Sequence, residues 1–228
     1  MKLQLLRFDD EVPVDAKAVS TLEIEDRALF ARVVASLESE AAEEAEEPYA
    51  LWEDEGDKKR SPRGAFLVLA SLPDVPLTDK KLLGKLYSHV AAQIADDADA
   101  EGEVIAAANT LEGLLLDWNI ELWGSYEFST SWDTSQMLKA FSFQPCFEEG
   151  TPLIERLVSF FGLCADIGLK QPILMVNAKS FLAENELDEL AEQAFFFGVP
   201  LLLLESWHDA STHEWERKTR IDQWFLEN

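Results

Sequence analysis

The sequence contains few of the residues that hold metal ions or take part in covalent catalysis. Its only cysteines are Cys146 and Cys164, and its only histidines are His89, His208 and His213. The cysteines form no CxxC pair and lie at no metal-ligand spacing from a histidine. We therefore expect two buried free thiols and three histidines that are surface or packing residues.

The sequence signatures of nucleotide and hydrolase chemistry are also missing. No GxxxxGK[ST] or GxGxxG phosphate loop occurs, and the nearest glycine spacing, Gly56 to Gly64, lacks the following Lys-Ser/Thr pair. GxSxG, HExxH and HxE…PCxxC are absent as well. We expect no catalytic residue, because nothing in the sequence indicates one.

Long apolar runs are absent, and positive charge is scarce. No segment reaches the roughly 20 apolar residues that span a bilayer, and the acidic first twenty residues do not resemble a secretory signal. The chain has 19 basic and 44 acidic residues, which gives a net charge of −25. This balance argues for solubility and against non-specific attraction to DNA or anionic membranes. We expect a cytoplasmic protein with no membrane contact.

The N-terminal third predicts strands and one helix. Residues 3–24 hold short apolar runs broken by Asp and Pro, which are typical of strands and turns. Apolar positions recur at helical spacing over residues 25–39. Residues 38–57, which hold ten acids and no base, and the basic KKRSPRG that follows are interpreted as a solvated loop, although the basic part could also contact phosphates. AFLVLASL, residues 65–72, predicts a buried strand.

The middle of the chain predicts two long helices. The first covers residues 79–94, and the second follows an acidic turn and carries apolar positions that step by 4, 3, 4, 3 and 4 residues, as in a coiled-coil seam. We expect an antiparallel hairpin that projects from the rest. The seam could pack against another part of the chain, or it could form contacts between subunits. Its positions are Val104, Ala108, Leu111, Leu115, Trp118 and Leu122.

The C-terminal part predicts a βαβ unit. A helix is expected with Thr151 as its N-cap, Pro152 in its first position and Gly168 after its end. Two fully apolar strands then flank another helix, and the first of them ends at Asn177. Ligands gather at the carboxyl ends of parallel strands, so Asn177 is at a position where an active site would lie.

These elements predict an α/β fold with a parallel sheet covered on both faces and an inserted helical hairpin. The α/β domain is expected to comprise residues 1–77 and 134–228, and the helical domain residues 78–133.

One stretch, ILMVNAKSFLAENELDELAEQAFFFGVPLLLLES, resembles the short form of the Csn-two family, the adaptation protein of type II-A CRISPR systems. In that family a strand ending in Asn-Ala, an aromatic-Leu pair, an acidic helix and a second apolar strand occur in this order. The start LEIEDRALFARVVASL and the long helical pair extend the resemblance over nearly the whole chain. The matching positions are Asn177, Ala178, Phe181, Leu182 and Glu184.

The resemblance implies a non-enzymatic protein with a degenerate P-loop-NTPase-like head and a helical leg, assembled as a ring-shaped homotetramer. Linear double-stranded DNA would thread through a basic central hole, with calcium (Ca2+) holding the legs in place and no nucleotide bound. The role would be spacer acquisition, with the CRISPR integrase proteins and the effector nuclease as partners. In such a protein Asn177 would cap or turn the chain.

A strongly acidic ring can still bind DNA if basic side chains line its hole. The field at the axis depends on the nearest charges, because salt screens charges over about 8 to 10 Å. Counterion release likewise counts only the contacted phosphates. Each candidate could equally be a solvated surface residue. The candidates for the lining are Lys58, Lys59, Arg60, Arg63, Lys80, Lys81, Lys85 and Lys139.

Calcium requires about six to eight oxygen ligands, usually including several carboxylates. The family places acids where the leg returns to the head. The carboxylates available there are Asp117, Glu121, Glu127 and Asp133, a small set for a calcium site.

Two other functions remain open. The chain could be a nucleotide-dependent enzyme of the P-loop-like α/β class whose phosphate site lies outside the known patterns. It could also be an acidic scaffold that binds a protein partner and no DNA.

Overall fold

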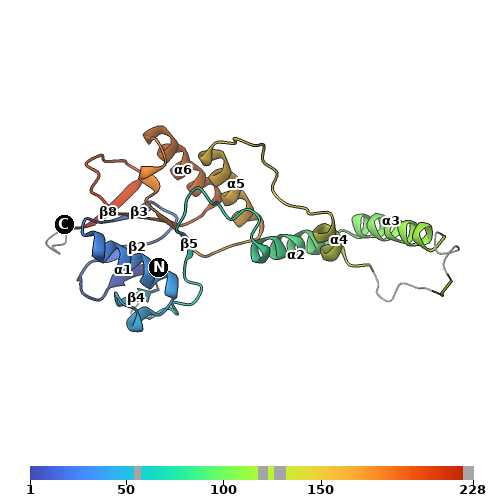
Figure 1. Ribbon diagram of the computed structural model, residues 1–228, viewed down its shortest axis with the longest axis horizontal. Coiled ribbons are helices and arrows are strands. Elements are labelled where there is room, and N and C mark those ends of the chain that lie inside the picture. Colours follow the sequence, from blue (N-terminus) through green and yellow to red (C-terminus); the bar gives the residue numbers. More distant parts are fainter. Residues whose placement is uncertain (54–57, 118–122, 126–131, 223–228) are drawn as a thin grey trace. The chain divides into compact units, whose positions relative to one another are not determined.

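The computed structural model describes residues 1–53, 58–117, 123–125 and 132–222. The chain divides into two compact units, whose helices and strands are labelled in Figure 1. The α/β unit comprises residues 1–76 and 147–228, and the helical unit comprises residues 77–146.

A parallel five-stranded sheet forms the centre of the α/β unit. Its order is β5-β6-β7-β3-β8, and all neighbouring strands run parallel. Every residue of β6 and β7 is buried, as expected of parallel strands covered on both faces. The predicted βαβ unit is therefore confirmed. The strands are β3 (Val19–Ile24), β5 (Leu67–Leu69), β6 (Ile173–Val176), β7 (Leu201–Glu205) and β8 (Glu216–Ile221).

A small antiparallel sheet and α1 (Arg27–Ser39) cover one face of the large sheet (Figure 1). The small sheet has the order β2 (Glu11–Pro13), β1 (Lys2–Leu5) and β4 (Tyr49–Trp52). Alternate residues of β6 and β7, such as Leu174 and Leu202, share one hydrophobic core with α1 and this sheet.

The interpretation of residues 38–57 as a solvated loop is wrong at residues 49–52, and residues 54–57 lie outside the described ranges. A short 3-10 helix, η1 (Ala42–Glu44), leads to β4, whose residues Tyr49, Ala50 and Leu51 are buried. The flanking acids obscured this strand, because only four residues, YALW, carry the apolar signal.

α5 (Leu153–Asp166) and α6 (Glu184–Phe197) cover the opposite face of the sheet, as Figure 1 shows. The predicted cap of α5 is off by one residue. Pro152 is the N-cap, and the Thr151 hydroxyl donates instead to the Glu148 carbonyl at 2.8 Å. Gly168 follows the helix with a φ of 62°, as expected of a glycine there.

The cysteine prediction is half correct. Cys164 on α5 is buried, whereas Cys146 is exposed. Cys146 is the last residue of the helical unit and lies beyond α4 (Thr134–Ala140), in a segment whose apolar residues Phe141 and Phe143 are exposed as well.

The helical unit is built on α2 (Lys80–Asp96), which begins where Asp79 Oδ1 accepts the N–H groups of Lys81 and Leu82. α4 packs against α2, and the Ser135 hydroxyl donates to the Tyr87 carbonyl at 3.5 Å. The sequence assigned residues 134–146 to the α/β domain, whereas the structure groups them with the helical unit.

The predicted antiparallel hairpin is not formed. α3 (Ala98–Asp117) begins directly after Asp97 and continues beyond the end of α2 in Figure 1. Asp97 Oδ1 accepts the N–H groups of Asp99 and Ala100, both at 3.1 Å, which starts the new helix at once. A single linking residue is too short to reverse the chain, since helical hairpins need at least about two.

Few of the described residues of the helical unit pack against the apolar seam of α3. Ala108 is the only buried residue among those described in this helix, whereas Leu111 and Leu115 are 39% and 43% exposed. Trp118 and Leu122 lie outside the described residues. The described part of the seam is therefore not packed against other described parts of the chain.

No helix in the described ranges is long and apolar enough to cross a membrane.

The core of the α/β unit can be tested at Leu174, which is fully buried in β6. Leu174→Ala removes apolar contacts and leaves a cavity, so the free energy of unfolding should fall by about 3 kcal/mol. Leu6→Ala, at a leucine that is 44% exposed, should lower it by less than about 1 kcal/mol. Urea unfolding of both variants measures the difference, and equal effects would contradict the described core.

Candidate functional site

Two of the eight candidate DNA-binding residues already have acidic partners. Lys58 Nζ lies 3.3 Å from Glu53 Oε1. Lys59 pairs with Glu43, and its Nζ lies 5.5 Å from the centroid of the Trp52 ring. The partner carboxylates compensate part of the lysine charge, which weakens the attraction of these two residues for a phosphate.

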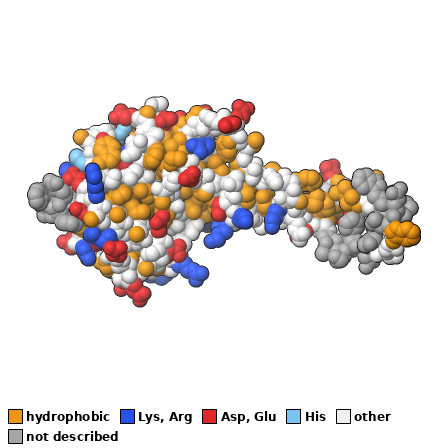
Figure 2. Space-filling model, viewed as in Figure 1, with side chains coloured by type: hydrophobic (Ala, Val, Ile, Leu, Met, Phe, Trp, Pro, Cys, Tyr) orange, Lys and Arg blue, Asp and Glu red, His pale blue; other side chains and the backbone are white. Residues whose placement is uncertain are grey.

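Unpaired positive charge is concentrated on α2. Between Asp79 and Asp96 this helix carries Lys80, Lys81 and Lys85 but no acid. The three lysines are exposed, and helical spacing sets them opposite the buried stripe. None of them forms an ion pair with an acid of the described chain. Figure 2 shows the blue side chains along this helix.

The remaining three candidates are exposed side chains in both units. Arg60 and Arg63 belong to the α/β unit, in the segment before β5. Lys139 lies in the last turn of α4 in the helical unit.

The predicted calcium ligands do not form a described metal site. Glu121 and Glu127 lie outside the described residues. Asp117 is the exposed last residue of α3, and Asp133 caps α4 by accepting the Gln136 N–H at 3.0 Å. Across the part of the chain that the structure describes, no group of three or more His, Cys, Asp or Glu side chains is arranged to hold a metal ion.

Asn177 has a structural role at the carboxyl end of β6. It adopts a left-handed conformation, with φ 55° and ψ 39°, so the prediction that it turns the chain is confirmed. Its side chain makes no cap to the following 3-10 helix, however. Instead its Oδ1 accepts the Ser206 N–H at 3.0 Å, and its own N–H donates to the Leu204 carbonyl at 2.8 Å. These bonds join the ends of β6 and β7.

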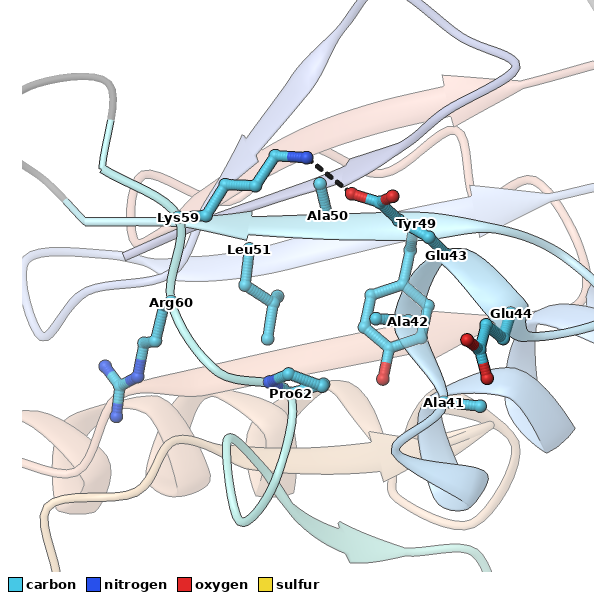
Figure 3. A pocket seen from close by; sticks show the side chains of 10 residues that line it. All are labelled: Ala41, Ala42, Glu43, Glu44, Tyr49, Ala50, Leu51, Lys59, Arg60 and Pro62. Carbon is cyan, nitrogen blue, oxygen red and sulfur yellow. Dashed lines mark hydrogen bonds and ion pairs between the residues drawn. The ribbon is translucent and has the colours of Figure 1, made fainter.

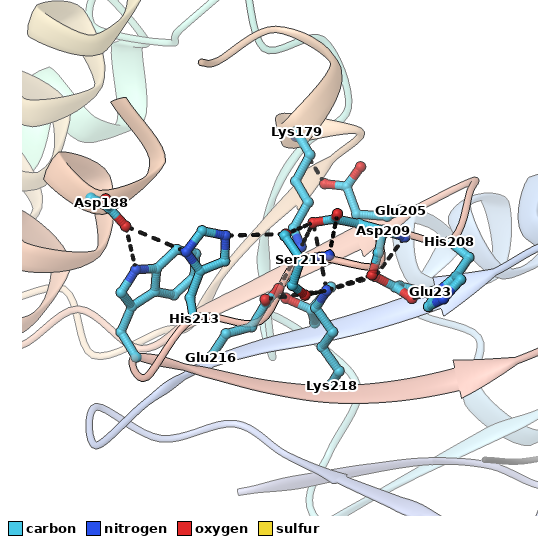
Figure 4. Close-up of polar contacts among 12 residues, drawn as sticks. Glu23, Lys179, Asp188, Glu205, His208, Asp209, Ser211, His213, Glu216 and Lys218 are labelled. Atoms are coloured by element: carbon cyan, nitrogen blue, oxygen red, sulfur yellow. Dashed lines mark hydrogen bonds and ion pairs between the residues drawn. The ribbon is translucent and has the colours of Figure 1, made fainter. Parts of the chain in front are cut away.

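Lys179 lies at the centre of an ionic cluster at this same edge (Figure 4). It belongs to η3 (Ala178–Ser180), and its side chain is 2% exposed. Its Nζ lies 2.7 Å from Glu216 Oε1 and 2.9 Å from Asp209 Oδ2. Its backbone N–H donates to Glu205 Oε1 at 3.1 Å.

A second lysine, Lys218 on β8, completes the cluster. Its Nζ donates to the carbonyl oxygens of Asp209 and Ser211 at 2.8 and 2.6 Å, and lies 3.4 Å from Glu23 Oε1. Glu23 Oε2 in turn lies 2.7 Å from His208 Nδ1. We refer to these residues as the carboxyl-edge cluster: Glu23, Lys179, Glu205, His208, Asp209, Glu216 and Lys218.

Burial and hydrogen bonding shift the pKa values of two carboxyl groups in the cluster. Burial raises the pKa of Glu205 to about 7, which the Lys179 N–H and ammonium offset only in part. Its Oε2 is buried without a hydrogen-bond partner in the described chain. Burial alone would also raise the pKa of Asp209, but the Ser211 hydroxyl and Lys179 hold it well below its usual range.

A Ser-His-Asp contact chain joins the segment after β7 to α6. Ser211 Oγ lies 3.2 Å from His213 Nε2, and His213 Nδ1 lies 3.5 Å from Asp188 Oδ1. The Ser211 hydroxyl, however, also donates to Asp209, whose carboxylate competes with the imidazole for its proton. Trp215 Nε1 donates to the same Asp188 oxygen at 2.7 Å. The contacts therefore fix this segment and do not activate the serine, which would need an uncontested base.

The carboxyl-edge cluster occupies the place where a parallel sheet commonly binds a nucleotide. A phosphate site needs free backbone N–H groups and a cation. Here the N–H and the ammonium of Lys179 both face carboxylates of the chain itself. The arrangement ties η3, β8 and the segment after β7 together and leaves no anion site at Lys179.

This cluster was not predicted from the sequence, because its partners are far apart along the chain. Glu23 meets His208 across 185 residues, and Lys179 meets Glu205 across 26. A signal was present nevertheless: β3 and β7 each carry a single buried glutamate near the end of the strand, Glu23 and Glu205.

Comparison with protein families identifies the relationship. Residues 42–216 match the family model of the CRISPR-associated protein Cas_Csn2. This is the Csn-two family that the sequence resembles. The chain belongs to this family. Membership implies a role in CRISPR adaptation.

A solved structure supports the fold. The crystal structure of Stu0660 of Streptococcus thermophilus is similar with a TM-score of 0.58 at 14% identity, over 97% of this chain and 75% of that chain. This likeness shows a shared fold. A comparison with curated protein sequences gives no match.

The pKa of Glu205 makes stability depend on pH. Its pKa of about 7 in the folded state exceeds the ordinary glutamate value of 4.5, so the folded state binds the extra proton and loses stability as the pH rises between these values. Glu205→Gln mimics the protonated form and should raise the free energy of unfolding at pH 8 by about 3 kcal/mol, with little change at pH 4.5.

Urea unfolding at both pH values measures this effect. Glu214→Gln, at an exposed carboxylate, is the matched control for the change in charge. A gain for Glu205→Gln that is the same at both pH values would show that the carboxyl does not titrate in this range.

Proposed function

We propose that this protein binds the ends of linear double-stranded DNA during spacer acquisition, without catalysis, in the cytoplasm. Family membership supports the role. The observation that carries the binding mode is the row of three unpaired lysines on α2, within a chain of net charge −25.

The α/β unit is proposed as a head of degenerate P-loop-NTPase-like type and the helical unit as a leg. The parallel sheet and the missing phosphate loop support the first assignment. The exposed leucines of α3 support a leg that packs against other subunits of a homotetrameric ring, because a heptad seam that is exposed among the described residues favours a partner outside the chain.

Binding would rest on phosphate contacts and would be largely independent of sequence. Each lysine that neutralises a phosphate releases a condensed counterion, and this gain does not require a positive protein overall. Local charge decides the contact because salt screens the distant acids within about 8 to 10 Å.

The nucleotide-dependent enzyme gains no support from the site, because Lys179 is held by Asp209 and Glu216. Calcium remains a prediction of the resemblance, as do the integrase proteins and the effector nuclease as partners. Two of the candidate calcium ligands are described: Asp117 is exposed at the end of α3, and Asp133 caps the start of α4.

Threading can be tested by comparing linear with covalently closed circular duplex of the same sequence and length. In mobility-shift experiments with and without calcium, the ring should bind the linear form and not the closed circle. Equal binding of both forms would contradict threading. Nucleotide turnover without DNA binding would favour the enzyme instead.

The lysines of α2 can be tested by charge reversal. Lys81→Glu with Lys85→Glu removes two neighbouring positive charges one helical turn apart, so DNA affinity should fall and the slope of log K against log salt should flatten by about 2. Lys58→Glu with Lys59→Glu should have a smaller effect, because both lysines are already paired.

Lys170→Glu, at an exposed lysine between α5 and β6, is the matched control and should leave the slope unchanged. An unchanged slope for the Lys81/Lys85 variant would show that this face of α2 does not contact phosphates.

A further inference from the structure

Two carboxyl groups occupy neighbouring positions at the carboxyl edge of the large sheet (Figure 4). The register of the parallel strands pairs Glu23 of β3 with Glu205 of β7, so their side chains are on the same face. Both residues are fully buried. Like charges directly opposite each other destabilise a sheet, and burial adds the cost of removing each charge from water. Two negative charges at these positions are therefore unfavourable.

Among the described residues, only one of the two carboxylates has cations beside it. Lys218 Nζ lies 3.4 Å from Glu23 Oε1, and His208 Nδ1 lies 2.7 Å from Glu23 Oε2. Glu205 forms no ion pair within the described chain, and its Oε2 is buried there without a hydrogen-bond partner. Burial raises the pKa of Glu205 to about 7, and the charge of Glu23 acts in the same direction. Glu205 is therefore the member of the pair that takes up a proton.

An exposed carboxylate elsewhere in the α/β unit shows the opposite behaviour. Figure 3 shows Glu43 of η1 paired with Lys59 at a hollow beside β4. The ammonium of Lys59 holds the pKa of Glu43 below its usual range. Glu43 therefore stays charged at neutral pH, whereas Glu205 exchanges its proton there.

The stretch between β7 and β8, residues 206–215, contacts the buried pair, and we call it the edge segment. The Asp209 N–H donates to Glu23 Oε1 at 3.3 Å, and the Ser206 N–H donates to Asn177 Oδ1 at 3.0 Å. None of the residues of the edge segment, all of which the structure describes, is buried. A segment with few buried apolar contacts opens at a lower free energy than core strands. The edge segment can therefore move while β3 and β7 keep the two carboxyl groups in place.

Charged and titratable groups from four elements lie around the pair and the edge segment. When Glu205 is ionised, it is the fourth carboxylate of a group that holds two lysines, because Glu23, Asp209 and Glu216 are present already. The surrounding groups are Lys179 of η3, His208 and Asp209 of the edge segment, Glu216 and Lys218 of β8, and, at the far end of the segment, His213 beside Asp188 of α6.

We propose that the edge segment is a pH-sensitive element, which stays closed against the sheet while Glu205 carries a proton and opens more often after the proton is lost. Opening admits water to Glu205 Oε2, and water stabilises the charged carboxylate. The closed form thus binds the proton more tightly than the open form. Opening should therefore increase as the pH rises from about 4.5 to about 7 and level off above this range. This inference is independent of DNA binding, which the proposal above assigns to α2.

Hydrogen exchange of the full-length protein measures the opening. The exchange rate of the unfolded chain at the same pH, divided by the observed rate, gives a protection factor that is free of the pH dependence of exchange itself. Between pH 5 and pH 8 the protection factor of the edge segment should fall by about tenfold or more. It should stay below that of β6 and β7 at each pH, because core strands exchange only in rarer openings.

Two variants identify the group that titrates. Glu205→Gln mimics the protonated carboxyl and should keep at pH 8 the high protection that the unchanged protein has at pH 5. His208→Gln removes the histidine that contacts Glu23, and histidine side chains commonly change charge in this pH range. This variant should lower the protection of the edge segment at every pH and leave its pH dependence in place.

Two further variants are matched controls for the change in charge. Glu214→Gln replaces an exposed carboxylate within the edge segment, and Glu43→Gln replaces the carboxylate paired with Lys59. Both should show the pH dependence of the unchanged protein. Thermal unfolding confirms that each variant is folded.

The proposal is overturned if the edge segment has the same protection factor at pH 5 and pH 8, or if Glu205→Gln keeps the pH dependence. Loss of the dependence in His208→Gln would assign the titration to the histidine and would also overturn it. Equal protection of the edge segment, β6 and β7 would show that the segment opens only when the whole unit unfolds, which contradicts a local opening.

Discussion

The ammonium of Lys179 lies between the carboxylates of Asp209 and Glu216, and the carboxyl edge of the large sheet depends on this contact. It connects η3, which follows β6, to β8 and to the segment between β7 and β8. A buried ion pair is a weak source of net stability, but removal of one member leaves the others without compensation. The contact therefore matters mainly for keeping these elements in one arrangement.

The same contact explains how a sheet suited to nucleotides can serve another role. In this chain both hydrogen-bonding groups of Lys179 face internal carboxylates, so the lysine is not available to an anion. Three unpaired lysines lie instead on α2, a helix of the helical unit. Such an arrangement is consistent with the DNA-binding role proposed above, which assigns phosphate contacts to α2 and needs no hydrolysis.

The sequence predicted the parts of this fold that rest on local periodicity. The two apolar strands around α6 and the helix after Asp79 were readable because burial on both faces or on one stripe leaves a regular pattern. β4 was missed because its four residues lie among acids. The hairpin was wrong because the acidic stretch taken for a turn is itself the start of α3, capped by Asp97.

The site was harder to predict than the fold for a physical reason. The candidate lysines could be found from composition, but pairing decides which of them remain free, and Lys59 is paired with a residue of η1, an element that the sequence did not reveal. The carboxyl-edge cluster joins residues from opposite ends of the chain, and each of them alone is an unremarkable charge in an acidic protein.

The most direct test of the account is the replacement Lys179→Met, compared with Lys170→Met, at an exposed lysine. The account predicts that Lys179→Met lowers the free energy of unfolding by about 3 to 5 kcal/mol at pH 8, because the carboxylates of Glu216 and Asp209, which are 1% and 16% exposed, lose their nearest cation. The folded fraction should bind linear duplex DNA as tightly as the unchanged protein. Unchanged stability together with a loss of DNA affinity would contradict the account, because Lys179 would then be a phosphate-binding residue.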